Sequence, residues 1–457
     1  MKKIALIPID NRPICHGLIE QICAIDKNIE LFLPERSLLG GLIESSDIER
    51  ILNWLENLPK VDYLVLSLDT IAYGGLVNSR RCPENYEEIL LRIKRLEKIV
   101  RNSNSKVYAF SSIMRISNNN INEEEKEYWA NWGEKIFEYS CNLHKSGAGK
   151  NSIPEDILED YLATRERNFK INKYYLELAA QGVFDTLVFS KDDTGEFGLN
   201  VKEAQTLGKL GGKNVFVKTG ADEIPLTLLA RTISDSEKIC VAPIFSHPSG
   251  AEKISKYEDI PLNLCVQSQL ELAGAEISNG GTDLNFIVNN FSSSQGDLVL
   301  GEANLANSVN FERSKPYFIA DVNNANGADF GFVKEFLQTS IDDNFYGYCG
   351  YNTSANSIGC TICTALTKFF ALKNGSYNDN AFKKLMLVRF LDDWAYQAKI
   401  RKKVREDGQK QGYFDISPYK NEFNPFEKTI CEFLKLNYDK IDYELPWKRS
   451  FEVEIVL

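Results

Sequence analysis

The feature that most constrains the fold of this chain is a series of short apolar segments, most of them followed by a helical pattern. Ten such segments recur between polar or glycine-containing turns: 3–9, 29–33, 62–68, 106–112, 185–190, 214–218, 239–244, 284–289, 316–321 and 345–349. Alternation of strands with helices predicts an α/β protein with a mainly parallel sheet. Segments such as 63–67 and 186–189 are almost wholly apolar, which indicates that helices cover both faces of the sheet.

Two architectures fit this alternation, a TIM-like barrel and two successive doubly wound sheets. Eight central strands would close into a barrel, whereas ten candidate strands and a short first connection also fit two open sheets. The 457 residues are enough for one very large core or for two, because single cores seldom grow beyond about 250–300 residues. We favour the barrel.

The domain organisation is expected to be one body followed by a smaller helical region. We expect an α/β catalytic body over residues 1–375, then a C-terminal helical region over 376–457 that ends in a strand at 450–456. Acidic and aromatic helical segments over 118–182 predict a helical insertion at the edge of the site. Residues 292–316 are rich in Ser and Asn and predict a loop with a short helix.

The net charge and the apolar segments limit the binding partners and the cellular compartment that we expect for this protein. A net charge of −11 opposes non-specific binding to nucleic acid, which requires clustered Lys and Arg. The first apolar run stops at Asp10-Asn11-Arg12, too soon for a signal peptide, and no segment approaches the roughly 18 apolar residues of a membrane span. We therefore expect a soluble, cytoplasmic protein with no membrane or nucleic-acid partner. Assembly into a homo-oligomer is compatible with the sequence.

Cysteine, histidine and glycine patterns exclude several cofactor chemistries. Cys360 and Cys363 have redox-motif spacing, but they lie in an apolar helical run and are expected to be core residues. The three histidines have no partner at zinc-ligand spacing. The chain also lacks a P-loop, a Gly-x-Ser-x-Gly elbow and a strand-linked Gly-x-Gly-x-x-Gly motif. No cofactor is expected.

Polar residues gather where the expected strands end, which is where ligand sites lie in parallel α/β folds. The carboxylates expected to carry the chemistry follow the fifth and sixth strands: Asp192, Asp193, Asp222 and Glu223. The residues expected to bind substrate follow these and the other strands: Asp10, Asn11, Arg12, Asp69, Tyr73, Arg80, Arg115, Arg231, His247, Asp321, Asn326, Tyr351, Asn352 and Asn356. Turns and helix caps also use Asp and Asn, but they require neither several arginines nor several carboxylates at one edge.

This lining suits a small, hydroxyl-rich and anionic ligand, because Asn and Asp bind vicinal hydroxyls and Arg pairs with a carboxylate or phosphate. Paired carboxylates predict a hydrolase, with a glycosidase favoured, that acts on a small sugar or sugar-acid glycoside. The same acids could instead hold a divalent cation in a hydrolase or lyase. A third interpretation is a small-molecule binding or sensing module. The sequence leaves these interpretations open.

Two further segments are ambiguous. Residues 257–259 are expected to cap the helix at 262–273 rather than to touch ligand. Farther on, four polar residues share one helix face by their spacing: Arg389, Asp393, Tyr396 and Gln397. This face either closes a site or belongs to a salt-bridged helix packed through its apolar side.

Several of these motifs together resemble the bacterial family called domain of unknown function 4127. The likeness rests on motifs spread over nearly the whole chain: 8–13, 67–69, 72–76, 79–80, 114–115, 220–223, 230–231, 257–259, 326–329, 350–353, 356, 393–394 and 396–397. Tyr351 departs from the pattern, where a Trp is expected, and keeps the aromatic character. The resemblance implies a single full-length module and a bacterial enzyme, but it implies no particular reaction or catalytic residue.

Overall fold

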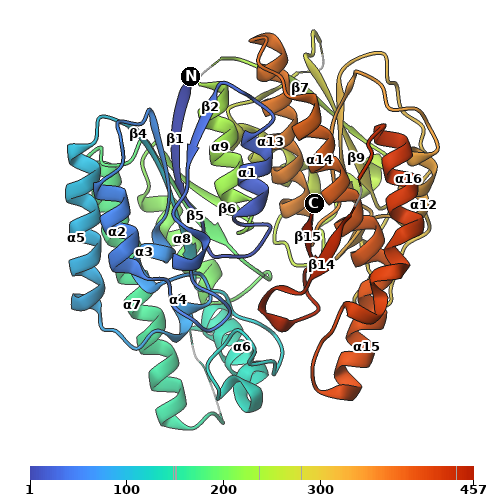
Figure 1. The fold of residues 1–457 in the computed structure, drawn as a ribbon. Helices are drawn as coiled ribbons and strands as arrows, with labels where there is room; N and C mark the ends of the chain where they lie inside the picture. Colours follow the sequence, from blue (N-terminus) through green and yellow to red (C-terminus); the bar gives the residue numbers. More distant parts are fainter. Residues whose placement is uncertain (148, 150–151, 236, 279, 439) are drawn as a thin grey trace. The chain divides into compact units, whose positions relative to one another are not determined.

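The computed structural model describes residues 1–147, 149, 152–235, 237–278, 280–438 and 440–457. The chain divides into two compact units. The first unit comprises Met1–Asn11 and Glu30–Pro225, and the second comprises Arg12–Ile29 and Leu226–Leu457. Each unit is built on its own parallel sheet with helices packed against it (Figure 1).

The sheet of the first unit has six strands in the order β2-β1-β3-β4-β5-β6. Their bounds are Lys2–Ile7 (β1), Ile29–Phe32 (β2), Tyr63–Ser67 (β3), Lys106–Ile113 (β4), Thr186–Lys191 (β5) and Val215–Thr219 (β6). The pairs β1–β3, β3–β4, β4–β5 and β5–β6 are all parallel. Every residue of β3 is buried, as expected for a strand covered on both faces.

The helices of the first unit follow its strands in turn. Their bounds are Arg36–Leu38 (η1), Ile48–Glu56 (α2), Leu68–Tyr73 (α3), Asn78–Arg81 (α4), Tyr86–Asn102 (α5), Trp129–Ser146 (α6), Glu155–Ala180 (α7) and Leu199–Leu210 (α8). Helices α2 and α5 lie side by side (Figure 1). A capping box formed by Asn85 and Glu88 fixes the start of α5. Helices α6 and α7 occupy most of 118–182, where a helical insertion was expected, and α7 packs on β4 and β5.

The sheet of the second unit has five strands in the order β13-β11-β9-β7-β8, and its pairs are again parallel. Their bounds are Cys240–Phe245 (β7), Glu276–Ile277 (β8), Leu284–Asn290 (β9), Tyr317–Val322 (β11) and Phe345–Cys349 (β13). Counted along the chain, the first five strands of both sheets have the same spatial order, 2-1-3-4-5. In such doubly wound sheets ligands bind at the carboxyl ends beside the switch point. That point lies between β1 and β3 in one unit and between β7 and β9 in the other.

The second unit also holds the C-terminal helical region. The helices of the unit are Gly17–Cys23 (α1), Ile224–Ser234 (α9), Pro248–Ala251 (α10), Leu262–Ala273 (α11), Phe330–Leu337 (α12), Ser354–Lys373 (α13), Asp379–Phe390 (α14), Leu391–Ile400 (η2, a π-helix), Arg401–Gln411 (α15), Ser417–Phe423 (η3), Asn424–Leu434 (α16) and Pro446–Lys448 (η4). Four short strands complete it: Gly296–Asp297 (β10), Asn324–Ala325 (β12), Asp442–Glu444 (β14) and Glu454–Val456 (β15). Although α1 comes early in the chain, it packs against α13 and α14.

The structure corrects two expectations about the fold. The barrel is wrong, because the described strands form two open main sheets. In each sheet the second strand lies on one side of the first and the later strands lie on the other, so the two edge strands never meet. The short helix expected within 292–316 is also absent, and that described segment contains the strand β10 instead.

One helix passes the length and composition test for a membrane span, against the expectation from the sequence. Helix α13 has 20 residues and a mean hydropathy of 1.2 in its most apolar window, of which 89% is buried. Core helices satisfy the same test, so this feature is weak evidence for a membrane segment. Cys360 and Cys363 are buried in this helix as free thiols, in agreement with their expected core role.

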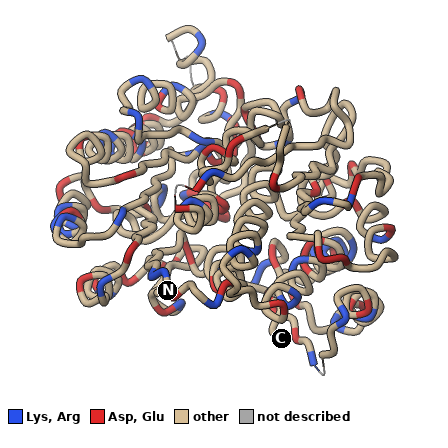
Figure 2. Tube along the Cα trace, turned by 90° about the horizontal axis from the view of Figure 1, so that it is seen from above, with Lys and Arg blue, Asp and Glu red and all other residues tan. Residues whose placement is uncertain are grey.

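Charged residues of both signs are interspersed along the helices. Figure 2 shows Lys and Arg positions close to Asp and Glu positions along many of these segments. Pairs such as Arg101 with Glu97, at 2.8 Å, follow the i, i+4 spacing of helix surfaces.

Candidate functional site

Six charged side chains meet at the carboxyl ends of β4 and β5 and form what we call the acid–arginine cluster. Its members are Arg80, Arg115, Glu124, Glu125, Asp192 and Asp193. Arg115 follows β4, and the two aspartates follow β5. Because β4 and β5 are neighbouring parallel strands, their exits meet at one edge of the sheet.

Arg115 is the centre of this cluster. Its Nη1 lies 2.9 Å from Asp193 and 3.4 Å from Asp192, so the two carboxylates lie within a few ångströms of each other. Its Nη2 and Nε contact Glu124 at 2.9 Å and Glu125 at 3.1 Å. Arg80 approaches the same two glutamates at 3.4 and 3.5 Å. Four carboxylates therefore share two guanidinium groups, which favours the protonated form of at least one acid.

Asp193 is the acid that this environment affects most. Burial of its carboxyl group, followed by the negative charge of Asp192, raises its pKa to about 7, while Arg115 opposes the shift. The side chain still keeps 37% of its surface exposed. Its backbone has a φ of +40°, a conformation that L residues other than Asn and Asp seldom adopt. A partly exposed carboxyl group that titrates near neutral pH is suited to donating a proton.

Asp69 lies deeper in the first unit, at the start of α3. It has no exposed surface, and it accepts hydrogen bonds from the backbone N–H of Ser112 at 2.7 Å and from the Ser111 hydroxyl at 3.4 Å. Burial raises its pKa to about 7. In the described part of the chain the Tyr73 hydroxyl has no hydrogen-bond partner, and Arg167 lies 5.5 Å from the centre of that ring. Asp69 and Tyr73 thus form a buried polar layer beneath the strand ends.

The exits of β1 and β6 carry further polar residues of the first unit. Glu223 accepts a hydrogen bond from the backbone N–H of Ala221 at 3.1 Å, within its own loop. Its carboxylate lies against Gly220, which has a φ of +108°, and an added Cβ there would be 1.7 Å from Oε1. Asp10 and Asp222 are buried at the same edge of the sheet. The Asn11 carbonyl accepts from Arg36 Nε at 2.7 Å.

The second unit has its own polar site at the carboxyl ends of β7, β9 and β11, which we call the asparagine–aspartate network. Its members are His247, Asn289, Asn307, Asp321, Asn323 and Asp329. His247 Nε2 lies 2.8 Å from Asn307 Oδ1, and the Asn307 amide donates to Asn289 at 2.7 Å. Asn289 in turn donates to Asp321 at 2.9 Å. One chain of hydrogen bonds thus joins the exits of three strands.

Asp321 is held inside this network. It accepts from the backbone N–H of Asp329 at 2.7 Å and from the Tyr348 hydroxyl at 3.0 Å. Burial, and then the charge of Asp329, raise its pKa well above the usual value. Sequence reasoning identified His247 and Asp321 but missed Asn289 and Asn307, because Asn is also a common turn residue.

Two left-handed asparagines shape the loops after β11 and β13. Asn326 has a φ of +63° and Asn352 has a φ of +52°, and the N–H of the first donates to the carbonyl of the second at 2.7 Å. Backbone strain of this kind is concentrated at functional sites. Tyr351 and Arg12 both donate to Glu452, each at 3.1 Å. These residues all belong to the second unit.

A comparison with family models identifies the chain. The model described as "Protein of unknown function (DUF4127)" matches residues 4–456. The chain belongs to this family. No curated protein and no solved structure matches it significantly.

Two residues that were singled out in this DUF4127 chain contact the ends of helices. Arg231 lies near the end of α9, and its Nη1 donates to the carbonyls of Glu271 and Leu272 at 3.3 and 3.2 Å. Arg231 therefore binds the last turn of α11. It lies far along α9 from the carboxyl end of β6, where a ligand was expected. Glu258 accepts from the backbone N–H of Ala355 at 2.8 Å, so it caps α13 rather than α11.

Glu124 and Glu125 are the acids of the cluster that sequence reasoning missed. They belong to the acidic segment Glu123-Glu-Glu, which is typical of a solvated helix surface. Glu125 is nonetheless only 3% exposed, since both Arg80 and Arg115 bind it. The signal that could have found it is the presence of two arginines at strand exits, which need carboxylate partners when buried.

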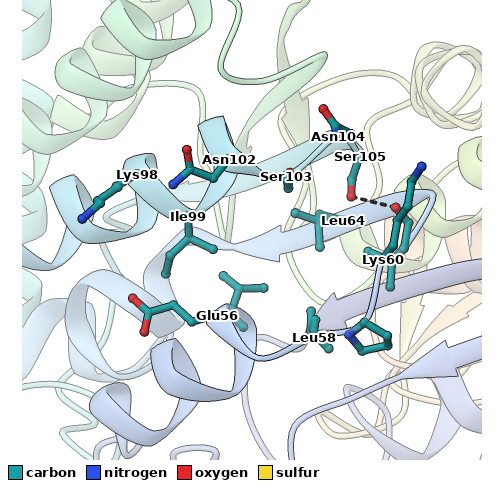
Figure 3. Close-up of a pocket in the computed structure, with 13 residues that line it drawn as sticks. Glu56, Leu58, Lys60, Leu64, Lys98, Ile99, Asn102, Ser103, Asn104 and Ser105 are labelled. Atoms are coloured by element: carbon teal, nitrogen blue, oxygen red, sulfur yellow. Dashed lines mark hydrogen bonds between the residues drawn. The ribbon is translucent and has the colours of Figure 1, made fainter.

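A group of metal ligands and a cavity of the first unit are two further places where a site could lie. Among the described residues, no group of three or more His, Cys, Asp or Glu is placed to hold a metal ion. A cavity of about 510 Å³ lies at the amino ends of β3 and β4, against the ends of α2 and α5 (Figure 3). Glu56 is the one carboxylate in its described lining, and it accepts from Arg95 Nε at 3.0 Å. The cavity therefore presents no acid–base pair.

Proposed function

We propose that this protein is a hydrolase related in mechanism to glycoside hydrolases, and that it acts on a small sugar or sugar-acid glycoside. The acid–arginine cluster of the first unit would carry the reaction. Asp193 would be the general acid, and Asp192 would supply the second carboxylate. The observation that carries the proposal is the contact of Asp193, on a partly exposed side chain, and of Asp192 with the same Nη1 atom of Arg115. The raised pKa of Asp193, about 7, supports it.

The chemistry follows from the two carboxyl groups. Asp193 would give its proton to the glycosidic oxygen as the bond from that oxygen to the anomeric carbon breaks. Water would supply the new hydroxyl group at the anomeric carbon, and the Asp192 carboxylate would accept the proton that this water loses. Asp192 and Asp193 both bind Nη1 of Arg115, and so they are held close enough to act on one bond. Arg115 is a positioning residue in this scheme.

The ligand class rests on the lining of the strand ends. Carboxylate and guanidinium groups at one edge of a sheet suit a ligand with several hydroxyl groups. The absence of a three-ligand acid or histidine group among the described residues favours acid–base chemistry over metal ligation by these acids.

A panel of chromogenic glycosides, including uronides, tests the proposal. The unmodified protein is expected to hydrolyse at least one of them, and Asp193→Asn is expected to lower kcat at least about a hundredfold, since general acid catalysis contributes about 10²–10⁴-fold. The matched control is Asp156→Asn, which makes the same change at an exposed position of α7 and should retain activity.

Two results would contradict the proposal. One is the absence of turnover across the panel while a sugar raises the melting temperature, which would indicate a binding module. The other is equal activity of Asp193→Asn and Asp156→Asn.

A further inference from the structure

Arg401 is a buried arginine at the start of α15, directly after the π-helix η2. Arg401 is only 8% exposed. Nη1 donates to Gln397 Oε1 at 2.8 Å, and the guanidinium group lies 5.0 Å from the centre of the Phe451 ring. Among the described residues Nε has no hydrogen-bond partner. A neutral amide oxygen and an aromatic face are thus the contacts of this cation.

The environment of Arg401 differs from that of Arg389 and Arg165, two other buried arginines. Arg389 forms ion pairs with Asp392 and Asp393, and Arg165 pairs with Glu203 at 2.7 Å. No carboxylate of the described chain forms an ion pair with Arg401. Burial lowers the pKa of Arg401, and the charge of Asp392 opposes this shift without cancelling it, while Asp393 and Asp392 raise the pKa of Arg389 despite its burial. Because buried charges are normally paired, an unpaired guanidinium is a costly feature without a ligand.

Gln397 is oriented so that its oxygen faces this arginine. Its Nε2 donates to Asp392 and to the Phe451 carbonyl, both at 3.1 Å, which turns Oε1 toward Arg401. The π-helix that carries Gln397 is a rare structure that occurs mostly at functional sites. Tyr351, at the carboxyl end of β13, is among the groups that influence the pKa of Arg401, so the arginine lies near that end of the second sheet.

We propose that Arg401 forms an anion-binding site in the second unit, which takes the carboxylate or phosphate group of a small ligand. The Nε and Nη2 donors lie on one edge of the planar guanidinium group, and this edge matches two oxygens of such an anion. Bonds from Nη1 to Gln397 and packing on Phe451 fix the plane of the group. The site lies within the second unit, and it does not depend on the hydrolase proposed for the first.

Thermal shift and calorimetric titration at constant ionic strength test this site, with inorganic phosphate and D-glucuronate as the anions and D-glucose as the neutral comparison. We expect saturable stabilisation of the full chain by at least one anion, and whichever anion binds identifies the group that the site prefers. Arg401→Met should weaken that binding at least about tenfold, because it removes charge-assisted hydrogen bonds.

Three variants distinguish an effect on anion binding from an effect on the stability of the fold. Without anion, Arg401→Met should melt at the same or a higher temperature than the unmodified protein, because it removes an unpaired buried charge. Arg389→Met should melt lower, because it leaves Asp392 and Asp393 without their cation. Lys403→Gln removes one positive charge from the exposed side of the same helix and should keep the affinity. The proposal is overturned if neither anion gives saturable stabilisation, or if Arg401→Met binds as tightly as Lys403→Gln.

Discussion

At the scale of single residues, two carboxyl groups of the first unit have a pKa near 7 but lie in different surroundings. Asp193 is partly exposed within a cluster of charges, whereas Asp69 is fully buried and fixed by donors from β4. Their exposure therefore distinguishes Asp193, which can contact a ligand, from Asp69, which lies in the interior. Burial is the largest cause of both shifts, so both should also affect the stability of the fold.

Asp69→Asn tests the buried member of this pair. Because the folded state raises the pKa of Asp69, its contribution to stability is greatest below the unfolded pKa near 4 and is lost as the pH rises through about 7. Asp69→Asn should lack this loss. The free energy of unfolding of the variant minus that of the unmodified protein should therefore increase by roughly 3 kcal/mol between pH 4 and pH 8.

Urea denaturation at these two pH values measures the difference. Asp156→Asn, at an exposed site, should show the same pH dependence as the unmodified protein. Parallel pH curves for Asp69→Asn and the unmodified protein would contradict the prediction, because they would show that folding does not raise the pKa of Asp69.

At the scale of elements, ten of the eleven strands in the two main sheets could be predicted, and β8 and the π-helix could not. Apolar segments mark the ten strands, whereas β8 has only two residues, Glu276 and Ile277, and both are exposed. Strand β1 ends before Pro8, which has no N–H to donate to a sheet. The polar face of 389–397 predicted a helix, but its period did not reveal a π-helix over Leu391–Ile400. The reason is that the π-helix is stabilised by distant contacts: Asp393 accepts from Gly350 N–H at 2.7 Å, and its carbonyl accepts from Ala328 N–H at 3.0 Å.

Gly327→Ala tests how closely this π-helix packs on the loop after β11. Gly327 has a φ of +137°, and an added Cβ would lie 2.8 Å from Gln397 Cβ and 2.9 Å from Leu298 Cδ1. Backbone strain and overpacking together should cost about 2–4 kcal/mol of stability. Gly375→Ala is the matched control, because Gly375 also has a positive φ, +69°, but nothing lies within 4 Å of its Cβ position.

The difference between these two variants reports the close packing at Gly327 together with the larger backbone strain at its φ of +137°. Chemical denaturation should show that Gly375→Ala loses about 1–2 kcal/mol, from strain alone. Equal losses for the two glycine variants would contradict close packing of the loop on η2.

At the scale of the whole molecule, the order of segments along the chain does not match the division into units. The segment Arg12–Ile29 belongs to the second unit although it lies between β1 and β2 of the first. Its contacts explain this: Lys27 N–H donates to the Ser376 carbonyl at 3.0 Å, and Asn378 N–H donates to the Ile25 carbonyl at 2.8 Å. Pairings over such a distance in sequence leave no local pattern, which is also why the barrel was favoured over two sheets.

Hydrogen exchange on the full chain tests this division. Phe345→Ala removes a fully buried ring of β13 and should destabilise the second unit by about 3–5 kcal/mol. Amides of α1 should then exchange faster together with those of α13, while those of β3 stay protected. Phe110→Ala, the equivalent change in β4, should have the opposite pattern. Faster exchange of α1 in Phe110→Ala alone would place that helix with the first unit.

The central claim is that one carboxyl group of the acid–arginine cluster holds its proton near neutral pH beside a second carboxylate. Infrared difference spectroscopy of the unmodified protein against Asp193→Asn measures this proton directly, through the C=O stretch of a protonated carboxyl group. The account predicts a band that is present at pH 5, that disappears with a midpoint near pH 7, and that Asp193→Asn lacks. A difference spectrum without a protonated carboxyl band at pH 5 would contradict it, because Asp193 would then already be ionised and could not act as the acid.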